Sequence, residues 1–514
     1  MKLSNLSKII LFPILSGILA IPAIFPLVRG GFFLSDDGGW MIIRFAAFYS
    51  SFSDGQFPVR FLKGLNFGYG YPVANFLYPG FMYMATPFHL LGLGLVDSVK
   101  VVLIGSFIFS AIFTFLWLRI HFGKLASLLG SVLFIYTPYH LYDLYKRGSV
   151  GEILSMTFIP LALFGIEKKN FYIISVSIFF LLITHNSIAF LFLPIIFIYT
   201  YLGNKISKQT IYGFVTGLLL SSFFTIPAVC ELGYTYFKKT SISNPFEYFA
   251  DTGLVGVSSI LILVVSLILF KFKNKAKITA SLLLLFIGIS ILSIFLSWPL
   301  SGFLWKSFIS QLLQFPFRAL SLLLLSTSFL GAYIVDNFKK NFQIIVFCIF
   351  LIIIIFTSYN FLAPKEYTEI PDSVYATNPD TTTVKNEYMP IWVKDFPHTQ
   401  YKDKVEFLNG NADVSDLVEK SNVISFNLSN VTSKNLRVNT IFYPGWNAYV
   451  NDRKVLINYD NDKGVMDIPV NIYSKNVRLV FSETPLRLFA DVLSFIGFAI
   501  LVLYPFNKLI KFKK

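Results

Sequence analysis

The chain has 514 residues, of which 55% are hydrophobic and 14% are charged, and its mean hydropathy is +0.65. Soluble domains carry roughly 25% charged residues, so this composition excludes a soluble enzyme, a disordered protein and a disulfide scaffold. The formal net charge of +15 does not indicate nucleic-acid binding, because the stretch 360–485 is net acidic and the basic excess lies in short loops.

Apolar runs that could cross ~30 Å of hydrocarbon follow one another along the chain. The predicted segments are 7–28, 73–93, 97–118, 124–142, 150–166, 171–184, 186–203, 209–230, 253–272, 276–297, 315–335, 341–359 and 486–506. The first is too long for a signal-peptide core and lacks a small-x-small cleavage site, which indicates an uncleaved anchor. Pro79, Pro87 and nearby glycines interrupt segment 73–93, which is typical of a re-entrant or interfacial segment.

Clustered lysines predict the orientation, since basic loops favour the cytoplasmic side. The N-terminus, the loops 167–170, 204–208, 271–277 and 336–341, and the tail 508–514 are expected inside. The loop 143–150 and the segment 360–485 are then expected outside. This parity requires an even number of crossings, so one segment does not cross, and the candidate is 73–93.

Two parts of the chain are predicted outside the membrane core. The first external loop, 29–72, contains an amphipathic stretch from Trp40 to Phe52 that suits a membrane interface, and 300–314 is similar. Segment 360–485 alternates with period two in its second half, as in Val477-Arg478-Leu479-Val480-Phe481, and turn signals separate the runs. This pattern predicts a small antiparallel β-domain, of sandwich type, directly before the last helix.

The predicted fold is a mainly α polytopic membrane protein with roughly twelve spans, one re-entrant or interfacial segment and a small extracytoplasmic β-rich domain. The predicted divisions are a transmembrane body at 1–359, the β-rich domain at 360–485, and a last helix with a basic tail at 486–514. The expected location is the plasma membrane, with the active face and the β-domain outside.

Five acidic residues of the body lie at segment ends on the predicted external face: Asp36, Asp37, Asp54, Asp143 and Glu152. Three more, Glu231, Glu247 and Asp251, lie in or beside one external loop. The pair Asp36-Asp37 follows the first helix within Ser-Asp-Asp-Gly-Gly. Adjacent carboxylates can supply a general base or hold a divalent cation. The alternative interpretation is a solvated turn or a helix cap, which Asp and Gly also favour.

Arg60 and Lys63 lie just before the glycine- and aromatic-rich stretch Gly68-Tyr69-Gly70-Tyr71-Pro72. Cations in such a setting at a membrane surface can bind a lipid-linked phosphate, and arginine does so bidentately. Interfacial anchoring by the aromatic side chains, with snorkelling cations, would produce the same pattern.

Three polar positions interrupt apolar segments. Glu152 begins one, with Arg147 as the nearest partner, and an ionisable residue there is a functional candidate or half of a structural pair. His185, in Thr184-His185-Asn186-Ser187, can act as a base, ligand or donor, or simply pack with one hydrogen bond. Arg318 could clamp a phosphate or anchor a helix end. No paired-histidine or paired-cysteine metal spacing occurs, and there is no Walker motif.

Taken in order, these pieces resemble the polytopic GT-C-type glycosyltransferases, and most closely the YfhO-like membrane proteins labelled "6-pyruvoyl-tetrahydropterin synthase-related". The matching pieces are Asp36-Asp37, Pro58-x-Arg60, Gly68-Tyr69-Gly70-Tyr71-Pro72, Arg147-Gly148-x-x-x-Glu152, Thr184-His185-Asn186, Phe315-Pro316-Phe317-Arg318, Asn386-Glu387-Tyr388-Met389-Pro390 and Tyr443-Pro444-Gly445-Trp446. They span about residues 30–490. Phe317 and Met389 depart conservatively from the expected Trp and Leu. The synthase label would require a three-histidine zinc site, and the five histidines do not have that spacing.

The resemblance implies transfer of a sugar from a polyprenyl-phosphate donor to a glycan, lipid or protein acceptor, with inversion at the anomeric carbon. It implies that Asp36 or Asp37 is the base, that Glu152 orients the site, and that these three carboxylates could hold a divalent metal ion. Arg60, Lys63, Arg147 and Arg318 would bind the donor phosphate, with Tyr69, Tyr71 and His185 as further site candidates. Membrane lipids are the expected surroundings and no nucleic acid is expected.

Two other functions share parts of this pattern. A transporter or flippase for a lipid-linked glycan would use the same arginines without a base. A non-catalytic cell-envelope assembly protein would use the β-domain to bind a partner.

Overall fold

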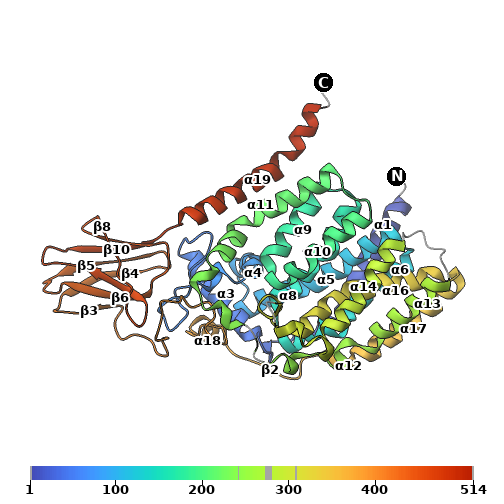
Figure 1. The fold of residues 1–514 in the computed structure, drawn as a ribbon, viewed down its shortest axis with the longest axis horizontal. Helices are drawn as coiled ribbons and strands as arrows, with labels where there is room; N and C mark the ends of the chain where they lie inside the picture. The colour runs from blue at the N-terminus through green and yellow to red at the C-terminus, as the bar shows by residue number, and fades with distance from the viewer. Residues whose placement is uncertain (1–2, 241, 243, 273–279, 307–308, 512–514) are drawn as a thin grey trace.

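The computed structural model describes residues 3–240, 242, 244–272, 280–306 and 309–511. Figure 1 shows a bundle of helices with a β-rich unit at one end of the long axis. Helix α19 (Pro485–Lys511) leaves this unit and packs along α11 (Lys208–Cys230). Most of the predicted basic loop 271–277 and the end of the tail 508–514 lie outside the described residues.

Within the described residues, seven helices are long and apolar enough to cross a membrane, and five further apolar helices have 10–17 residues. The twelve are α1 (Leu3–Ile18), α5 (Leu95–His121), α6 (Lys124–Tyr136), α8 (Val150–Glu167), α9 (Phe171–Thr184), α10 (Asn186–Leu202), α11, α13 (Val257–Phe272), α14 (Ala280–Leu296), α16 (Ser321–Asn337), α17 (Lys340–Ser358) and α19. Each overlaps a predicted segment, so their prediction as helices is confirmed, although segment 7–28 is not one helix: α1 ends at Ile18, and α2 (Ile21–Ile24) and a 3₁₀ turn (Phe25–Val28) follow. That all twelve cross a membrane stays a prediction.

Two predicted segments differ from simple spans. Segment 73–93 forms a 3₁₀ turn and α4 (Gly80–Leu90), whose 11 residues extend over only ~16 Å. Segment 124–142 is not continuous: α6 ends at Tyr136, and a short helix α7 (Pro138–Tyr142) follows. Pro138 lacks the N–H that would continue the first helix, which explains the break.

The course of α5 bears on the predicted orientation. Near its start, the Lys100 ammonium donates to the carbonyl of Arg29 at 2.7 Å. At its end, His121 lies 3.5 Å from Glu167, which Lys205 also contacts at 2.7 Å. The loops containing Glu167 and Lys205 therefore meet the end of α5 on one face of the bundle. This is the arrangement expected if segment 73–93 does not cross.

Close helix packing depends on small residues at the crossings. A Cβ atom on Gly217 of α11 would lie 2.7 Å from the Ile178 side chain of α9. One on Gly497 of α19 would lie 2.8 Å from the backbone of α11. Small residues let membrane helices approach closely, so glycine here sets the spacing of α9, α11 and α19.

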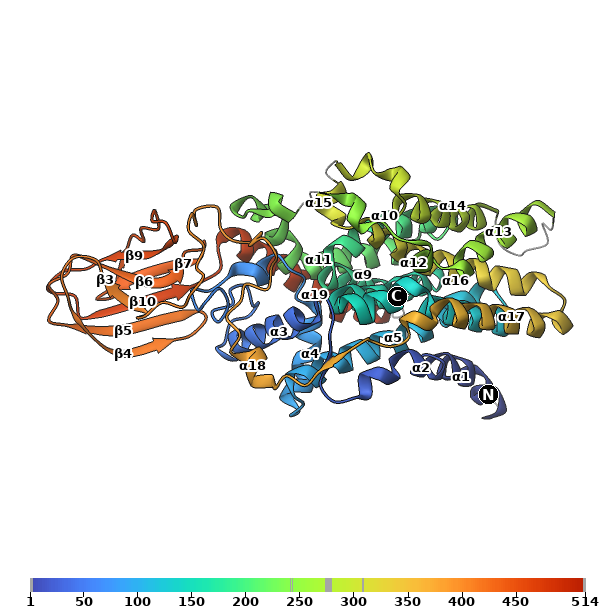
Figure 2. The ribbon, with the colours of Figure 1, turned by 90° about the horizontal axis from the view of Figure 1, so that it is seen from below.

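The predicted β-domain forms two antiparallel sheets, which lie one above the other in Figure 1 and overlap in the view of Figure 2. The five-stranded sheet has the order β4-β5-β10-β7-β8, and these strands are Asp413–Glu419, Val423–Ser429, Asn476–Phe481, Trp446–Val450 and Arg453–Val455. The three-stranded sheet has the order β3-β6-β9, and these strands are Val405–Phe407, Asn435–Ile441 and Val465–Pro469. Alternate residues such as Ile424, Phe426 and Leu479 are buried, as the period-two pattern predicts.

Residues 360–404 do not join these sheets but run back along the helical body. β2 (Tyr367–Thr368) pairs with β1 (Phe32–Phe33) of the first predicted loop. Beyond the short helix α18 (Asp372–Ala376), the Tyr388 N–H donates to the Tyr71 hydroxyl at 3.2 Å. This return segment brings residues of the second half of the chain onto α3 (Gly38–Ser53), which is packed against α4, α5 and α18.

Candidate functional site

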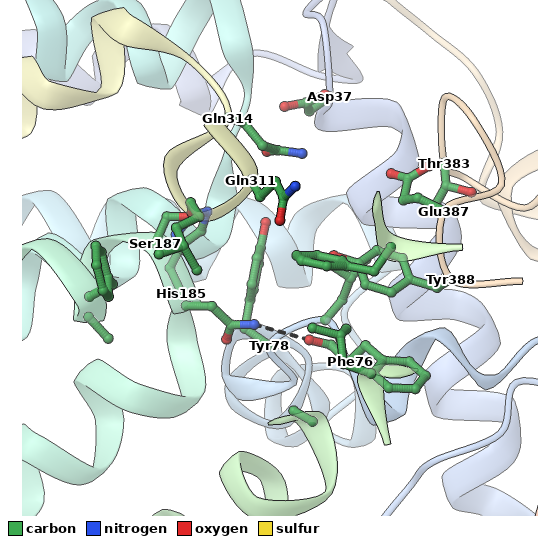
Figure 3. Close-up of a pocket in the computed structure, with 18 of the residues that line it drawn as sticks. Asp37, Phe76, Tyr78, His185, Ser187, Gln311, Gln314, Thr383, Glu387 and Tyr388 are labelled. Carbon is green, nitrogen blue, oxygen red and sulfur yellow. Dashed lines mark hydrogen bonds between the residues drawn. The ribbon is translucent and has the colours of Figure 1, made fainter. Parts of the chain in front are cut away.

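A chamber of about 470 Å³ lies where α3, the α9–α10 junction, the end of α11, the turn before α16 and the return segment meet. Figure 3 shows Asp37, Gln311 and Gln314 along one part of its wall, with Thr383, Glu387 and Tyr388 approaching from the return segment. Side chains of α10 and α11, such as Phe190 and Val229, make another part of the wall apolar. The chamber therefore combines charged, polar and apolar surfaces from these five parts of the chain.

Glu152, at the start of α8, is fully buried behind this chamber. Its Oε2 accepts from Arg147 Nη1 at 2.6 Å and from Arg318 Nε at 3.0 Å, and its Oε1 accepts from the Tyr139 hydroxyl. His185 Nε2 lies 3.8 Å from the same Oε2 atom. Two residues of the segment before α8 and two from other segments thus meet on one carboxylate, and charge pairing with hydrogen bonds is what permits its burial.

Arg147 connects this buried group to the first predicted loop. Its guanidinium donates to Asp143 Oδ1 at 2.8 Å and to Asp37 Oδ2 at 3.2 Å. The Asp37 N–H in turn donates to the Arg147 carbonyl at 2.7 Å. Gly148 has φ +67°, and a Cβ atom there would lie 2.5 Å from Ser35 Oγ. Glycine is therefore required for the loop with Asp36-Asp37 to sit on the turn after Arg147.

Asp143 is the second carboxylate behind the chamber. Burial raises its pKa well above the usual range, and the nearby charge of Glu152 adds to the effect. Its Oδ2 has no hydrogen-bond partner among the described residues. These observations favour a protonated Asp143, so that Glu152 carries the negative charge that Arg147 and Arg318 balance.

The structure separates the two adjacent aspartates. The Asp36 side chain is 48% exposed and pairs with Lys146 at 2.7 Å. The Asp37 side chain is 29% exposed, pairs with Arg147 and lines the chamber. Only Asp37 of the two therefore borders the chamber that contains Arg318 and His185.

The predicted metal ligands do not form a metal site. Asp36, Asp37 and Glu152 are each paired with a lysine or arginine. Nowhere in the described ranges do three or more His, Cys, Asp or Glu side chains form a group that could hold a metal ion. The cations already compensate the charge that a divalent ion would require, so these residues do not fit one.

The structure does not bring Arg60 and Lys63 into the chamber. Arg60 pairs with Glu483 at 2.7 Å and with Asp491 at 2.9 Å, at the start of α19. Lys63 pairs with Asp54 at 2.7 Å. Their charges are thus balanced where the first predicted loop meets α19 and the β-rich unit, away from Arg147 and Arg318.

The two tyrosine candidates also lie outside the chamber wall. Tyr69 is buried against Tyr401 of the segment before β3, and its carbonyl accepts from the Ile441 N–H at 2.8 Å. Tyr71 lies behind the wall, and its hydroxyl bonds to Thr383 at 3.1 Å. Both position the first predicted loop on neighbouring segments.

Arg44 is a chamber residue that the sequence interpretation missed. It is buried in α3, donates from Nε to Thr382 Oγ1 at 2.8 Å and also donates to the Thr382 carbonyl. Within the described residues, no Asp or Glu forms an ion pair with it, unlike Arg147 and Arg318. Its signal in the sequence is an arginine within the stretch from Trp40 to Phe52, whose amphipathic pattern favours only an interfacial position.

Comparisons with known proteins do not assign a family. No family model matches the chain, and no curated protein matches it. Among solved structures, the chain is similar to the arabinofuranosyltransferase AftD from Mycobacteria, with 16% identity and a TM-score of 0.43. The match covers 70% of this chain and 27% of that one, so this chain spans about a quarter of its length. The fold and the site described above therefore carry the functional argument.

Proposed function

We propose that this protein is a GT-C-like membrane glycosyltransferase. It would move a sugar from a polyprenyl-phosphate donor to an extracytoplasmic acceptor, with inversion at the anomeric carbon. The observation that carries the proposal is that Asp37 borders a chamber that also holds a second carboxylate, Glu387, three arginines and an apolar wall. A lipid-linked phosphate donor requires these three kinds of surface together.

The apolar wall supports a lipid-linked donor. Phe190 of α10 and Val229 of α11 line the chamber, and the two residues are 48% and 74% exposed. Helix α9 has 14 residues, about 21 Å, so the α9–α10 junction at the chamber lies within the depth of a ~30 Å hydrocarbon layer. A polyprenyl chain could lie between α10 and α11 without leaving apolar surroundings.

The arginines support a phosphate leaving group. Arg147 and Arg318 both bind Glu152, which holds them in place beside the chamber, whereas Arg44 has only neutral partners. Fixed cations at the point where negative charge develops stabilise a transition state without reorganisation. In this proposal Arg44 makes the direct phosphate contact, and Arg318 and Arg147 contribute a positive field.

Asp37 would be the base. Its carboxylate accepts the proton of the acceptor hydroxyl while the acceptor oxygen attacks the anomeric carbon. The bond from that carbon to the phosphate oxygen breaks on the opposite face, and the electron pair leaves with polyprenyl phosphate. The products are the inverted glycoside and a lipid phosphate, with the proton on Asp37.

The test is a donor-turnover assay with the full-length protein in lipid nanodiscs. Asp37→Asn should lower sugar transfer by about 10²- to 10⁴-fold, the usual contribution of a general base. Asp97→Asn is the matched control, because it removes an exposed carboxylate at the start of α5 that does not border the chamber, and it should keep most of the activity. Full transfer by Asp37→Asn would remove the base assignment. Movement of donor across the bilayer without release of polyprenyl phosphate would instead indicate a flippase.

A further inference from the structure

A second cavity, of about 450 Å³, adjoins the chamber. The two share Asp37, Arg147 and Phe315 in their walls, so Asp37 stands at the boundary between them. The second cavity draws its other walls from α7, from the segment 247–254 before α13 and from Phe361 after α17. The function proposed above places the donor in the first chamber and leaves this second cavity without a ligand.

Aromatic rings make up much of the second cavity. Phe315 lies against Tyr248 at 4.9 Å between ring centroids and against Phe317 at 5.1 Å. Tyr142 in turn contacts Phe317 at 5.8 Å and Phe361 at 6.4 Å. This wall is rigid because each ring packs against at least one neighbouring ring. Flat aromatic faces pack well against the C–H face of a pyranose or furanose ring.

Carboxylates provide the polar groups of the same cavity. Besides Asp36 and Asp37, it is lined by Glu247 and Asp251. These two accept hydrogen bonds from neutral donors, Asn244 Nδ2 at 2.9 Å and the Leu254 N–H at 2.7 Å. Carboxylates accept several hydrogen bonds each, so free lone pairs remain for sugar hydroxyl groups. Arg147, the cation in the lining, is already bound to Asp37, Asp143 and Glu152.

We propose that this second cavity is the acceptor site, and that it selects a carbohydrate acceptor that is neutral or carries an amine. The proposal rests on the function proposed above, which defines this ligand as the acceptor of the transferred sugar. Stacking on the aromatic wall holds the acceptor ring, the carboxylates bind its hydroxyl groups, and one hydroxyl reaches Asp37 at the boundary. A uronic acid or a phosphorylated sugar is rejected, because it would meet Glu247 and Asp251 without a free cation.

The test measures binding without any donor, so its result is independent of the transfer assay. Saturation-transfer NMR on the full-length protein in nanodiscs would compare methyl glycosides of a neutral hexose, an amino sugar and a uronic acid. The neutral and amino glycosides should bind and the uronide should not. Tyr248→Ala should weaken neutral binding by about tenfold, the effect of one lost ring contact. Phe246→Ala, on the same loop but outside the cavity, is the matched control and should bind like the unchanged protein.

A second variant tests the charge rule without altering volume. Glu247→Gln combined with Asp251→Asn should allow the uronide to bind. The proposal fails if the unchanged protein binds none of the three glycosides, or binds the uronide as tightly as the neutral one. It also fails if Tyr248→Ala and Phe246→Ala give the same affinity. Absence of donor turnover, with this selectivity intact, would instead overturn the glycosyltransferase assignment and leave a carbohydrate-binding cavity.

Discussion

Two buried ionic clusters of this molecule look alike but differ in what surrounds them. In the chamber cluster, Glu152 holds Arg147 and Arg318 next to a cavity. In the joint cluster, Glu231 at the end of α11 holds Arg487 of α19 at 2.8 Å and accepts from Tyr443 and Asn75, also at 2.8 Å. Both bury a carboxylate with arginine.

The difference lies in the groups left for a ligand. At the joint, Glu231 has donors on both oxygens, and the cluster ties a membrane helix to the β-rich unit. At the chamber, Asp37 borders two cavities and Arg44 has no carboxylate partner among the described residues. A buried ion pair alone therefore does not identify a functional site. A buried ion pair beside a cavity that also contains a cation without a carboxylate partner does indicate one.

The largest expected effect lies at the joint. Arg487→Met should lower the stability of the protein by about 3–5 kcal/mol, because it leaves Glu231 buried without its charge partner. Thermal unfolding in nanodiscs measures this. The double variant Glu231→Gln with Arg487→Met should recover part of the loss, since no unpaired charge remains. Equal instability of the single and double variants would contradict a stabilising ion pair.

The next effect lies at the chamber. Arg44→Met should lower sugar transfer by about 10²- to 10³-fold, the usual result of removing one fixed group that stabilises developing charge. The unfolding temperature should change little, because no buried carboxylate is left unpaired. Arg29→Met is a matched control, since Arg29 lies over the Tyr367 ring outside the chamber. A similar loss of transfer in both variants would show that Arg44 has no special role in the chamber.

The smallest effect concerns Asp143. A raised pKa in the folded state means that the folded protein binds the proton more tightly than the unfolded chain, so Asp143 stabilises at low pH. This stability is lost as the pH rises from the ordinary range of Asp through the folded pKa. Asp143→Asn imitates the protonated form and should show a flatter decline of unfolding temperature over this range, with transfer retained. An unchanged pH profile would mean that Asp143 is already ionised.

Periodicity in the sequence predicted the local structure well. A helix needs only an apolar run of sufficient length, and a strand only an alternating one, so the twelve helical segments and the strands near Val477 could be read directly. The interruption of segment 73–93 was equally visible, because proline acts on its own neighbours.

The ion-pair partners of charged residues were harder to predict from the sequence than the helices and strands. Arg147 and Glu152 lie five residues apart at one turn, and their pairing was expected. Arg60 pairs with residues more than 400 positions away, so its removal from the donor site could not be foreseen. Arg44 stood out as an arginine in an apolar run, but its place in the chamber depends on the return segment around Thr382.

The sequence by itself therefore determined which segments are helices or strands, and it marked the scarce polar residues of the apolar body. Both properties follow from interactions between near neighbours along the chain. Only the tertiary structure decided which of those polar residues face a common cavity and which neutralise one another. That outcome depends on contacts between distant segments, whose free energies are comparable for many pairings until packing selects one of them.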